Sequence, residues 1–455
     1  MNEAPSAPPP AWPAVIRREV LDILRSGAWL NRARMRFVAW AVLVASLIGF
    51  GYLVATAYDS VDVLGRPLGT DFSNIYAAGT YVLEGKAAAP FDPALQHARE
   101  QAIFGQDTPF YGWHYPPFLL FVAGALALMP YGLALAAWQI ATFLLYLLMI
   151  RAILAAAGSG EANRPANLIV ADRLWLLLAS AFPAVFINLG HGHNGFLTAA
   201  LIGGGLVLLD RRPAVAGILF GLLAYKPQFG LLIPLMLATT GRWRAFASAV
   251  ATVALLVVAC TLAFGPGVWE AFLASASFTR RVVLEAGDTG WHKIQSVFSW
   301  VRMWGGTIAL AYALQAAVTI VSGAALVWLW RSAAPFALKA AALCMVAILA
   351  TPYSLDYDMM VLAPAIAFFA ADGLVRGFGP WEKTALAALW LVPLVARSVT
   401  LATFIPLGVW SMLAVLVALL RRAATDPDRQ APALSPAALR RSSEERGIMC
   451  RYCRA

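Results

Sequence analysis

The sequence predicts an all-α protein whose helices cross a membrane many times. Of its 455 residues, 61% are hydrophobic and only 13% are charged, and the mean hydropathy is +0.71. A soluble domain is closer to half apolar and one quarter charged. The apolar residues also gather in repeated runs that approach the thickness of a bilayer. Together these observations exclude an ordinary soluble fold.

Thirteen apolar runs are candidate spans, since a helix needs about 20 apolar residues to cross a bilayer. In chain order they are 37–57, 117–129, 132–150, 174–190, 195–209, 213–225, 228–241, 245–264, 306–330, 336–351, 357–372, 383–397 and 401–420.

Two chain ends on one side of the membrane require an even number of spans. We therefore expect about twelve membrane-spanning helices. The region 117–150, which Pro130 interrupts, is where two candidates are most readily fused or re-entrant.

The net charge of +10 is concentrated at the two ends of the chain. The arginines before the first span are Arg17, Arg18, Arg25, Arg32, Arg34 and Arg36, and those after the last are Arg421, Arg422, Arg429, Arg440, Arg441 and Arg446. Basic residues that flank spans mark the cytoplasmic side, so we expect membrane attachment and no nucleic-acid partner. The expected parts are a basic cytoplasmic segment 1–36, a membrane domain 37–420 and a basic, disordered cytoplasmic tail 421–455. The first span is an uncleaved anchor, not a signal peptide.

Four cysteines are too few and too scattered for a disulfide framework. Cys450 and Cys453 form a C-x-x-C pair in the basic tail. A structural zinc site needs four ligands, and no second pair accompanies this one. We expect no metal site and no cofactor.

The positive-inside rule places the polar clusters of the chain on one side of the membrane. The pairs at 211–212 and 242–244 are basic and therefore cytoplasmic, so the turn 225–228 between them is outer. The same counting makes 191–194, 265–305 and 351–358 outer. The loop 58–116 carries seven acidic residues against three Lys or Arg, again an outer composition.

Asp71 lies in this first outer loop, which has nearly 60 residues and is far longer than a simple connection. Loops of that length are usually functional or disordered. Two amphipathic stretches, 76–84 and 93–104, predict short helices at the membrane interface. Asp71 has two interpretations: it is an N-cap for a helix that starts near Ser73, or its carboxylate performs chemistry outside the cytoplasm.

Lys226 and the two histidines of 191–194 leave alternatives open. An ammonium between two apolar half-spans is costly unless it is paired, lies at the interface or holds an anionic group. His191 and His193 fit a satisfied polar turn, a metal site or a substrate contact.

The outer loop 265–305 is unusual in carrying cations, namely Arg280, Arg281, His292 and Lys293. Arginine forks match phosphate oxygens, so these side chains fit either a solvated loop face or a phosphate site. Asp356 and Asp358 open a later span on the same side. They cap that helix or pair with the arginines.

Several catalytic signatures are missing from the sequence. It contains no Walker loop, no dinucleotide fingerprint in a strand context, no G-x-S-x-G and no H-E-x-x-H. The chain therefore either uses an activated substrate delivered in the membrane or moves a substrate without hydrolysis.

An ordered set of short motifs resembles glycosyltransferase family 87, the polyprenyl-phosphate-mannose-dependent mannosyltransferases of the GT-C class, over roughly 37–420. The motifs are Thr70-Asp71-Phe72, Tyr76-Ala77-Ala78-Gly79, His114-Tyr115-Pro116-Pro117, Gly192-His193-Asn194, Lys226-Pro227-Gln228 and Thr351-Pro352-Tyr353-Ser354. This chain departs from the family at Gly192-His193, where the family often has Gly-Gln.

The resemblance implies a GT-C-type helical bundle in a bacterial inner (plasma) membrane, with its active site facing the periplasm or exterior. It implies transfer of a hexose, mannose in the family, from a polyprenyl-monophosphate donor to a lipid or glycan acceptor. Asp71 matches the family's catalytic aspartate and would act as the general base of an inverting displacement.

The leaving phosphate needs cations, and the candidates for this role are Lys226, His292, Lys293 and Arg281. The expected substrate-binding residues are Tyr76, His114, Tyr115, His193, Asn194, Gln228, Asp356 and Asp358.

Two other functions stay open at this point. A transporter or flippase of lipid-linked glycans would also have many spans, but repeat symmetry between its halves is expected and no clear repeat is present. A polymerase or ligase of surface glycans would also use lipid-linked substrates, and there arginines would be central instead of a single aspartate near the first span.

Overall fold

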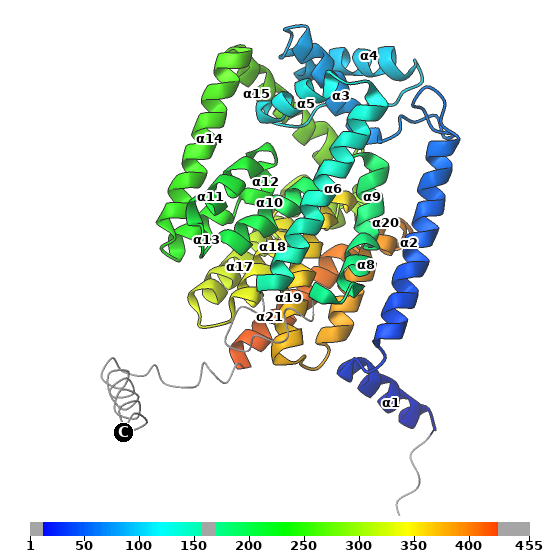
Figure 1. Cartoon of the computed structure of the whole chain (residues 1–455), viewed down its shortest axis with the longest axis vertical. Coiled ribbons are helices and arrows are strands. Elements are labelled where there is room, and N and C mark those ends of the chain that lie inside the picture. The colour runs from blue at the N-terminus through cyan, green and yellow to red at the C-terminus, as the bar shows by residue number, and fades with distance from the viewer. Residues whose placement is uncertain (1–11, 157–169, 426–455) are drawn as a thin grey trace, which may run out of the picture.

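The computed structural model describes residues 12–156 and 170–425, and they form an all-helical bundle (Figure 1). The α-helices are α1 (Trp12–Ser26), α2 (Arg32–Ala55), α3 (Thr70–Leu83), α4 (Pro93–Phe104), α5 (Leu120–Ala127), α6 (Tyr131–Ala156), α8 (Leu174–Ser180), α9 (Pro183–His191), α10 (Gly195–Leu208), α11 (Pro213–Leu222), α12 (Pro227–Gly230), α13 (Ile233–Thr239), α14 (Trp243–Phe264), α15 (Gly267–Thr279), α16 (Val297–Met303), α17 (Ile308–Arg331), α18 (Phe336–Leu349), α19 (Leu362–Arg376), α20 (Glu382–Thr403) and α21 (Leu407–Thr425).

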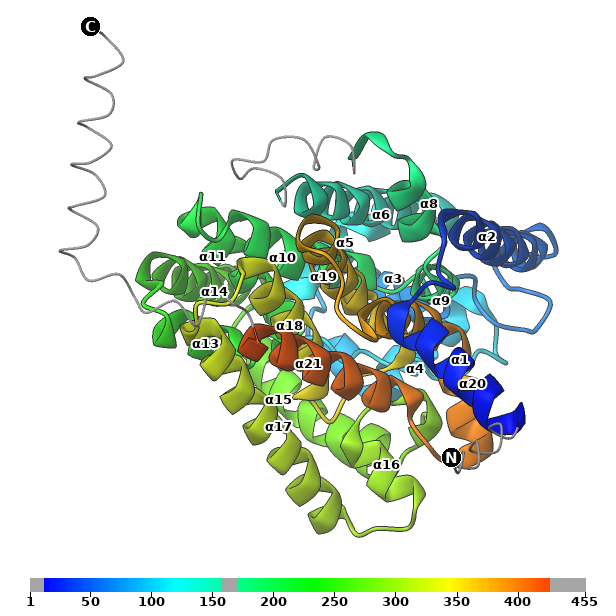
Figure 2. The same ribbon diagram turned by 90° about the horizontal axis from the view of Figure 1, so that it is seen from below.

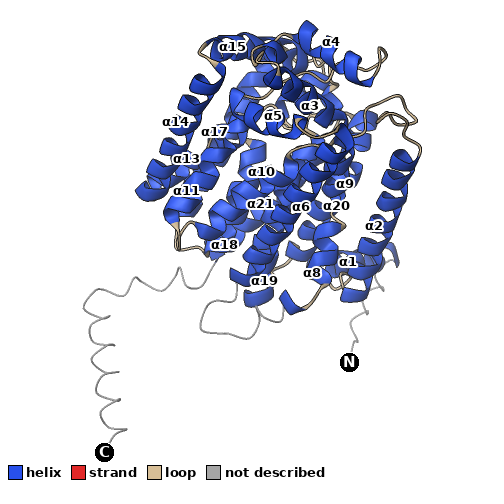
Figure 3. Ribbon diagram, turned by 45° about the horizontal axis from the view of Figure 1, so that its top comes forward, coloured by secondary structure: helices blue, strands red, loops and turns tan. Residues whose placement is uncertain are grey.

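Shorter helical turns connect several of these helices. They are the 3-10 turns η1 (Ala89–Phe91), η2 (Pro117–Leu119), η3 (Leu223–Tyr225), η5 (Trp291–Lys293) and η6 (Asp356–Val361), and the π-helical turn η4 (Arg280–Glu285). The described residues contain isolated β-bridges but no strand (Figure 3), which confirms the all-α prediction.

The expected number of about twelve spans is wrong. Among the described residues, seven helices are long and apolar enough to cross a membrane, or eight if α8 and α9, which meet at a 44° bend, form one span. Five further apolar helices have only 10–17 residues. The 14 residues of α10, for example, extend about 21 Å, well short of a hydrocarbon core of about 30 Å. Sequence counting treated these short helices as full spans.

The region 117–150 is divided at Pro130, as expected. The segment 117–129 is not a span, because η2 and α5 together cover only 117–127 and α5 packs against α3. On the other side of Pro130, α6 runs for 26 residues and is one of the long apolar helices.

A cap formed by α3, α4, α5 and α15 covers one end of the bundle, while α1 and the end of α21 lie at the other (Figure 1). In the cap, α3 and α5 approach so closely that a Cβ on Gly79 would lie 2.1 Å from the carbonyl oxygen of Ala123. The helix predicted at 93–104 is confirmed. The other predicted cap helix starts earlier, at Thr70, and most of its residues are buried against the bundle instead of lying at an interface.

The short helices reverse direction inside the bundle, at 192–194, at Lys226 and at 350–356. In Figure 1 the turn between α11 and α12 lies well below the upper end of α14. Tyr225–Gln228 is therefore not a turn at the outer surface, and Lys226 is buried at 5% exposure. Snorkelling of Lys226 is excluded by that burial.

Helix α18 lies near the middle of the bundle, as Figure 2 shows from the end opposite the cap. It packs against α17, α19 and α21, and nearly all of its residues are buried. On one side, α11 packs closely on α14, where a Cβ on Gly217 would lie 2.2 Å from the carbonyl oxygen of Ala245. Small residues at such positions allow helix backbones to approach inside a membrane.

Parts of the predicted termini lie outside the described residues. This holds for the start of the 1–36 segment and, in the C-terminal tail, for Arg429, Arg440, Arg441, Arg446, Cys450 and Cys453. The sidedness of the bundle in the membrane stays a prediction.

Glu100 of α4 anchors the loop between α4 and η2. Its carboxylate is fully buried and accepts hydrogen bonds from the backbone N–H groups of Tyr111 (3.1 Å) and Gly112 (3.2 Å) and from the Gln96 amide (3.3 Å). Burial raises the pKa of Glu100 to about 7, from an unfolded value near 4.5, although these hydrogen bonds oppose the shift.

This raised pKa predicts a loss of stability as pH rises from about 5 to 7. The folded protein holds a proton on Glu100 that the unfolded chain has already released in this range, so the contribution is complete below the unfolded pKa and is gone above the folded one. At about 1.4 kcal/mol per pKa unit the effect is at most a few kcal/mol. Glu100→Gln should flatten the pH dependence of the thermal unfolding midpoint over this range.

Glu84→Gln is the matched control in the same cap. Glu84 pairs with Arg99 (2.6 Å), which lowers its pKa to about 2, so it does not titrate between pH 5 and 7. An unchanged pH slope in Glu100→Gln, or an equal change in Glu84→Gln, would contradict the assignment.

Candidate active site

One cavity of about 1440 Å³ lies between the cap and the interior turns of the bundle. Nine of the predicted site residues line it: Asp71, His114, Tyr115, His193, Lys226, Gln228, Lys293, Asp356 and Asp358. They come from segments far apart in sequence, so the expectation that the polar clusters converge holds for these nine.

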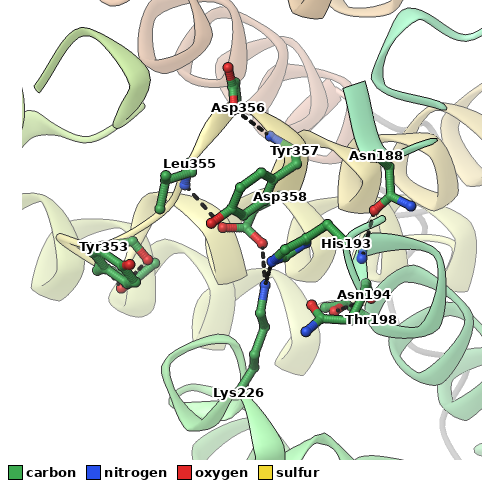
Figure 4. Close-up of polar contacts among 12 residues, drawn as sticks. Asn188, His193, Asn194, Thr198, Lys226, Tyr353, Leu355, Asp356, Tyr357 and Asp358 are labelled. Carbon is green, nitrogen blue, oxygen red and sulfur yellow. Dashed lines mark hydrogen bonds and ion pairs between the residues drawn. The ribbon is translucent and has the colours of Figure 1, made fainter. Parts of the chain in front are cut away.

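A buried ion pair forms the polar floor of this cavity. The Lys226 Nζ atom lies 2.6 Å from the Asp358 Oδ1 atom, and both side chains are almost completely buried (Figure 4). The other carboxylate oxygen of Asp358 accepts from the backbone N–H of Leu355 at 3.0 Å. Asp358 therefore caps η6, as one interpretation expected, but its cationic partner is Lys226 and not one of the loop arginines.

His193 packs on top of this pair, but its turn is not a fully satisfied one, because the buried His193 Nδ1 atom has no hydrogen-bond partner within the described structure. Its Nε2 atom accepts from the Lys226 ammonium at 3.3 Å and lies 3.2 Å from the Tyr115 hydroxyl. Its ring stacks on Tyr357 with the centroids 3.5 Å apart. With a protonated lysine as the donor, the proton of the neutral ring is on Nδ1.

Asp71 stands in the first turn of α3, facing His191. The helix begins at Thr70 and its N-cap is Gly69, which offers no side-chain cap, so the N-cap interpretation of Asp71 is wrong. The Asp71 Oδ1 atom lies 3.5 Å from His191 Nδ1, which also hydrogen bonds to the Thr70 hydroxyl at 2.7 Å. The carboxylate keeps part of its surface open to the cavity.

Close backbone contact between α3 and the end of α9 produces this arrangement. Gly192 ends α9 with φ +59°, in the left-handed region that favours glycine. A Cβ at that position would lie 2.6 Å from the Phe72 side chain and 3.2 Å from the Gly69 Cα atom. A glycine at position 192 therefore allows the end of α9 to meet the start of α3. This contact brings His191 within reach of Asp71.

Two cations face the upper part of the cavity. Arg397 of α20 lies 3.5 Å from Asp356, and Lys293 of η5 lies close by. Lys293 is held there by the backbone hydrogen bond from Gln295 N–H to the Ser354 carbonyl, at 2.7 Å. Burial and the neighbouring Arg397 guanidinium lower the pKa of Lys293 below its ordinary value. Among the described residues, no carboxylate lies within ion-pairing distance of Lys293.

His114 closes the cavity from the cap. Its Nδ1 atom hydrogen bonds to the Thr279 hydroxyl at 2.9 Å. Burial lowers its pKa to about 4, so the ring is neutral at neutral pH. It contributes a hydrogen-bonding group and no positive charge.

Four predicted residues do not line the cavity: Tyr76, Asn194, Arg281 and His292. Tyr76 donates to the Met129 carbonyl at 3.0 Å and packs edge-on against Tyr131, which joins α3 to the start of α6. Arg281 is exposed near the start of η4 and donates to the Ser277 carbonyl. The side-chain amide of Asn194 is buried, and within the described part of the chain it has no hydrogen-bond partner.

The sequence interpretation considered His191 as a substrate contact but left it out of the expected site residues, and it missed Arg397. A signal existed for each: His191 is two residues from His193, and Arg397 ends an apolar run, where an ionisable side chain is functional by default.

An apolar arm extends the cavity sideways to the peripheral helix α2. Its walls include Phe50 and Leu53 of α2, Ile140 of α6, and Phe186 of α9. Of the residues in α2, Ala39 alone is buried in the described structure. The arm is therefore an apolar slot between α2 and the rest of the bundle.

The described residues contain no group of three or more His, Cys, Asp or Glu side chains placed to hold a metal ion. The expectation of a metal-independent site stays a prediction.

Sequence comparison identifies the class of protein. No curated protein and no solved structure is significantly similar to this chain. Residues 113–352, just over half of the chain, match the family model for glycosyltransferase family 87. The matched segment contributes His114, Lys226 and Lys293 to the cavity, and membership implies a GT-C membrane fold. The chain is a membrane glycosyltransferase that belongs to family 87.

Proposed function

We propose that the protein transfers a hexose, mannose by analogy with the family, from a polyprenyl-monophosphate donor to a hydroxyl of a lipid or glycan acceptor. The observation that carries the proposal is the composition of the cavity of about 1440 Å³. It joins a partly open carboxylate, Asp71, to a cationic pair, Lys293 and Arg397, and to an apolar slot on α2. These three features correspond to an acceptor hydroxyl, a phosphate and a lipid chain.

Asp71 is the carboxylate best suited to act as general base. Asp358 is neutralised by Lys226 and accepts a backbone N–H, and Asp356 accepts from the Tyr357 N–H and lies near Arg397. The Asp71 carboxylate has one ion-pair contact in the described structure, to His191. We propose that His191 positions Asp71 and that the free oxygen faces the acceptor.

Lys293 and Arg397 are the proposed contacts of the donor phosphate. Like charges held together at a cavity wall are stabilised by an anion, and an Arg fork fits phosphate oxygens. Lys226 was also a candidate for this role, but its charge is already matched by Asp358. It supplies a fixed dipole beneath the site. His292 and Arg281 do not line the cavity and are not proposed for phosphate binding.

The proposed step is a direct displacement with inversion. The acceptor oxygen forms a bond to the anomeric carbon while the bond between that carbon and the phosphate oxygen breaks. The hydroxyl proton passes to Asp71, and the electron pair leaves with the polyprenyl phosphate, whose developing charge Lys293 and Arg397 stabilise.

The distribution of basic residues supports a proposed location. Arg211, Arg242 and Arg422 lie at the end of the bundle opposite the cap, and basic flanks mark the cytoplasmic side. We propose that the cavity faces the periplasm or exterior of a bacterial inner membrane, with 37–420 as the catalytic domain. Membership of a glycosyltransferase family speaks against the transporter and flippase alternatives, and no observation favours a polymerase or ligase.

Asp71→Asn should lower turnover by about a hundredfold or more, because the amide cannot accept a proton and general base catalysis contributes about 10²–10⁴-fold. Folding should be preserved, since Asp71 is not a helix cap. The assay measures sugar transfer beside donor binding. Asp288→Asn is the control, because it makes the same change on an exposed carboxylate at the rim of the same cavity. Near-normal transfer by a folded, donor-binding Asp71→Asn protein would reject Asp71 as the base.

The donor is tested in membrane vesicles of known orientation. Transfer should require a polyprenyl-monophosphate sugar on the side of the cap and should not occur from a soluble nucleotide sugar, because the slot on α2 accepts a lipid chain. Arg397→Gln should weaken donor binding. Arg151→Gln, near the C-terminal end of α6 and outside the cavity, should not. Efficient transfer by purified protein from a nucleotide sugar would disprove the donor assignment, and transfer from the opposite membrane face would disprove the orientation.

A further inference from the structure

A second hollow, distinct from the active-site cavity, lies on the outside of the bundle. It has a volume of about 770 Å³ and runs between α13 and α17, which pack side by side (Figure 1). Its walls are formed on one side by Leu232 and Leu235, and on the other by α17 from Thr319 to Ser332. Gly323 and Ala324 make it deep, because neither carries a large side chain. We call it the α13–α17 groove.

The groove has the length of one membrane leaflet. The twelve steps from Thr319 to Arg331 extend about 18 Å along α17. Half of a hydrocarbon core of about 30 Å is roughly 15 Å. The groove therefore begins near the bilayer midplane and ends at the membrane surface opposite the cap, where α17 ends.

The surface end of the groove is cationic. Arg331 lines it and is exposed, and Trp328, a residue type typical of membrane interfaces, lies one turn earlier. The Lys339 ammonium donates to the carbonyl of Ser332, another lining residue, at 2.7 Å. The Arg242 guanidinium lies over the Trp330 ring at 5.6 Å. Arg242 also forms an ion pair with Asp210. Three cations thus accompany one carboxylate.

We propose that the α13–α17 groove binds an anionic phospholipid of the leaflet opposite the cap. One acyl chain lies along Leu235, Gly323 and Ala324, and the headgroup phosphate meets the Arg331 guanidinium. A zwitterionic lipid fits the apolar walls equally well but brings its own positive charge to a cationic end. Basic pockets between membrane helices select anionic headgroups for this reason. This site is independent of sugar transfer.

The test counts lipids bound to full-length protein in a neutral detergent by native mass spectrometry. Phosphatidylglycerol and phosphatidylcholine with the same acyl chains are compared. We expect phosphatidylglycerol to bind more tightly, by about fivefold for each basic residue that its headgroup meets. Arg331→Gln should remove most of this preference, and Arg331→Lys should keep part of it, because lysine retains the charge without the fork.

Two further variants separate the groove from the general surface. Ala324→Phe fills the groove from an exposed position and should reduce binding of both lipids. Arg151→Gln changes an exposed arginine near the end of α6, on the other side of the bundle (Figure 2), and should have no effect. Equal binding of the two lipids by the unaltered protein would overturn the proposal. So would a preference that survives Arg331→Gln, or one that Arg151→Gln reduces equally.

Discussion

The buried pair of Lys226 and Asp358 is the contact on which the interior of the bundle depends. It joins the turn between α11 and α12 to the start of η6, two segments 132 residues apart. His193 and Tyr357 cover it, so a third turn, between α9 and α10, is fixed to the same point. A charge at this depth is costly unless it is paired. The pair therefore requires these turns to meet inside the protein.

That requirement explains why the structure has a cavity at this place. Helices that turn back inside the bundle leave room between their turns and the cap, and their polar residues become the floor of that room. Gly192 then allows α9 to meet α3, which brings His191 to Asp71, and the bridge between 294 and 355 brings Lys293 beside Arg397. The proposed catalytic carboxylate, Asp71, lies in the cavity wall and is partly exposed. The structural ion pair of Lys226 lies at the cavity floor and is buried.

The sequence was sufficient for the helical membrane class, the family and most of the residues that line the cavity. Hydropathy and local motifs carry that information directly. The number of spans was not predictable, because an apolar run of 14 residues, such as α10, has the composition of a span without its length. The partner of Lys226 was not predictable either, since Asp356 and Asp358 were equally available in sequence. Arg281 and Arg280 are neighbours, yet of the two only Arg280 lines the cavity, and the sequence does not indicate which of two adjacent side chains faces it.

A double-mutant cycle on Lys226 and Asp358 tests most directly whether this pair holds the interior together. The free energy of unfolding is measured for Lys226→Met, for Asp358→Asn and for the double variant. Removal of one partner of a buried pair costs about 3–5 kcal/mol because the other charge is left unpaired, whereas replacing both is far less costly. We expect each single variant to lose several kcal/mol and the double variant to recover most of that loss. Single variants as stable as the unaltered protein, or losses that simply add in the double variant, would contradict the central role of the pair.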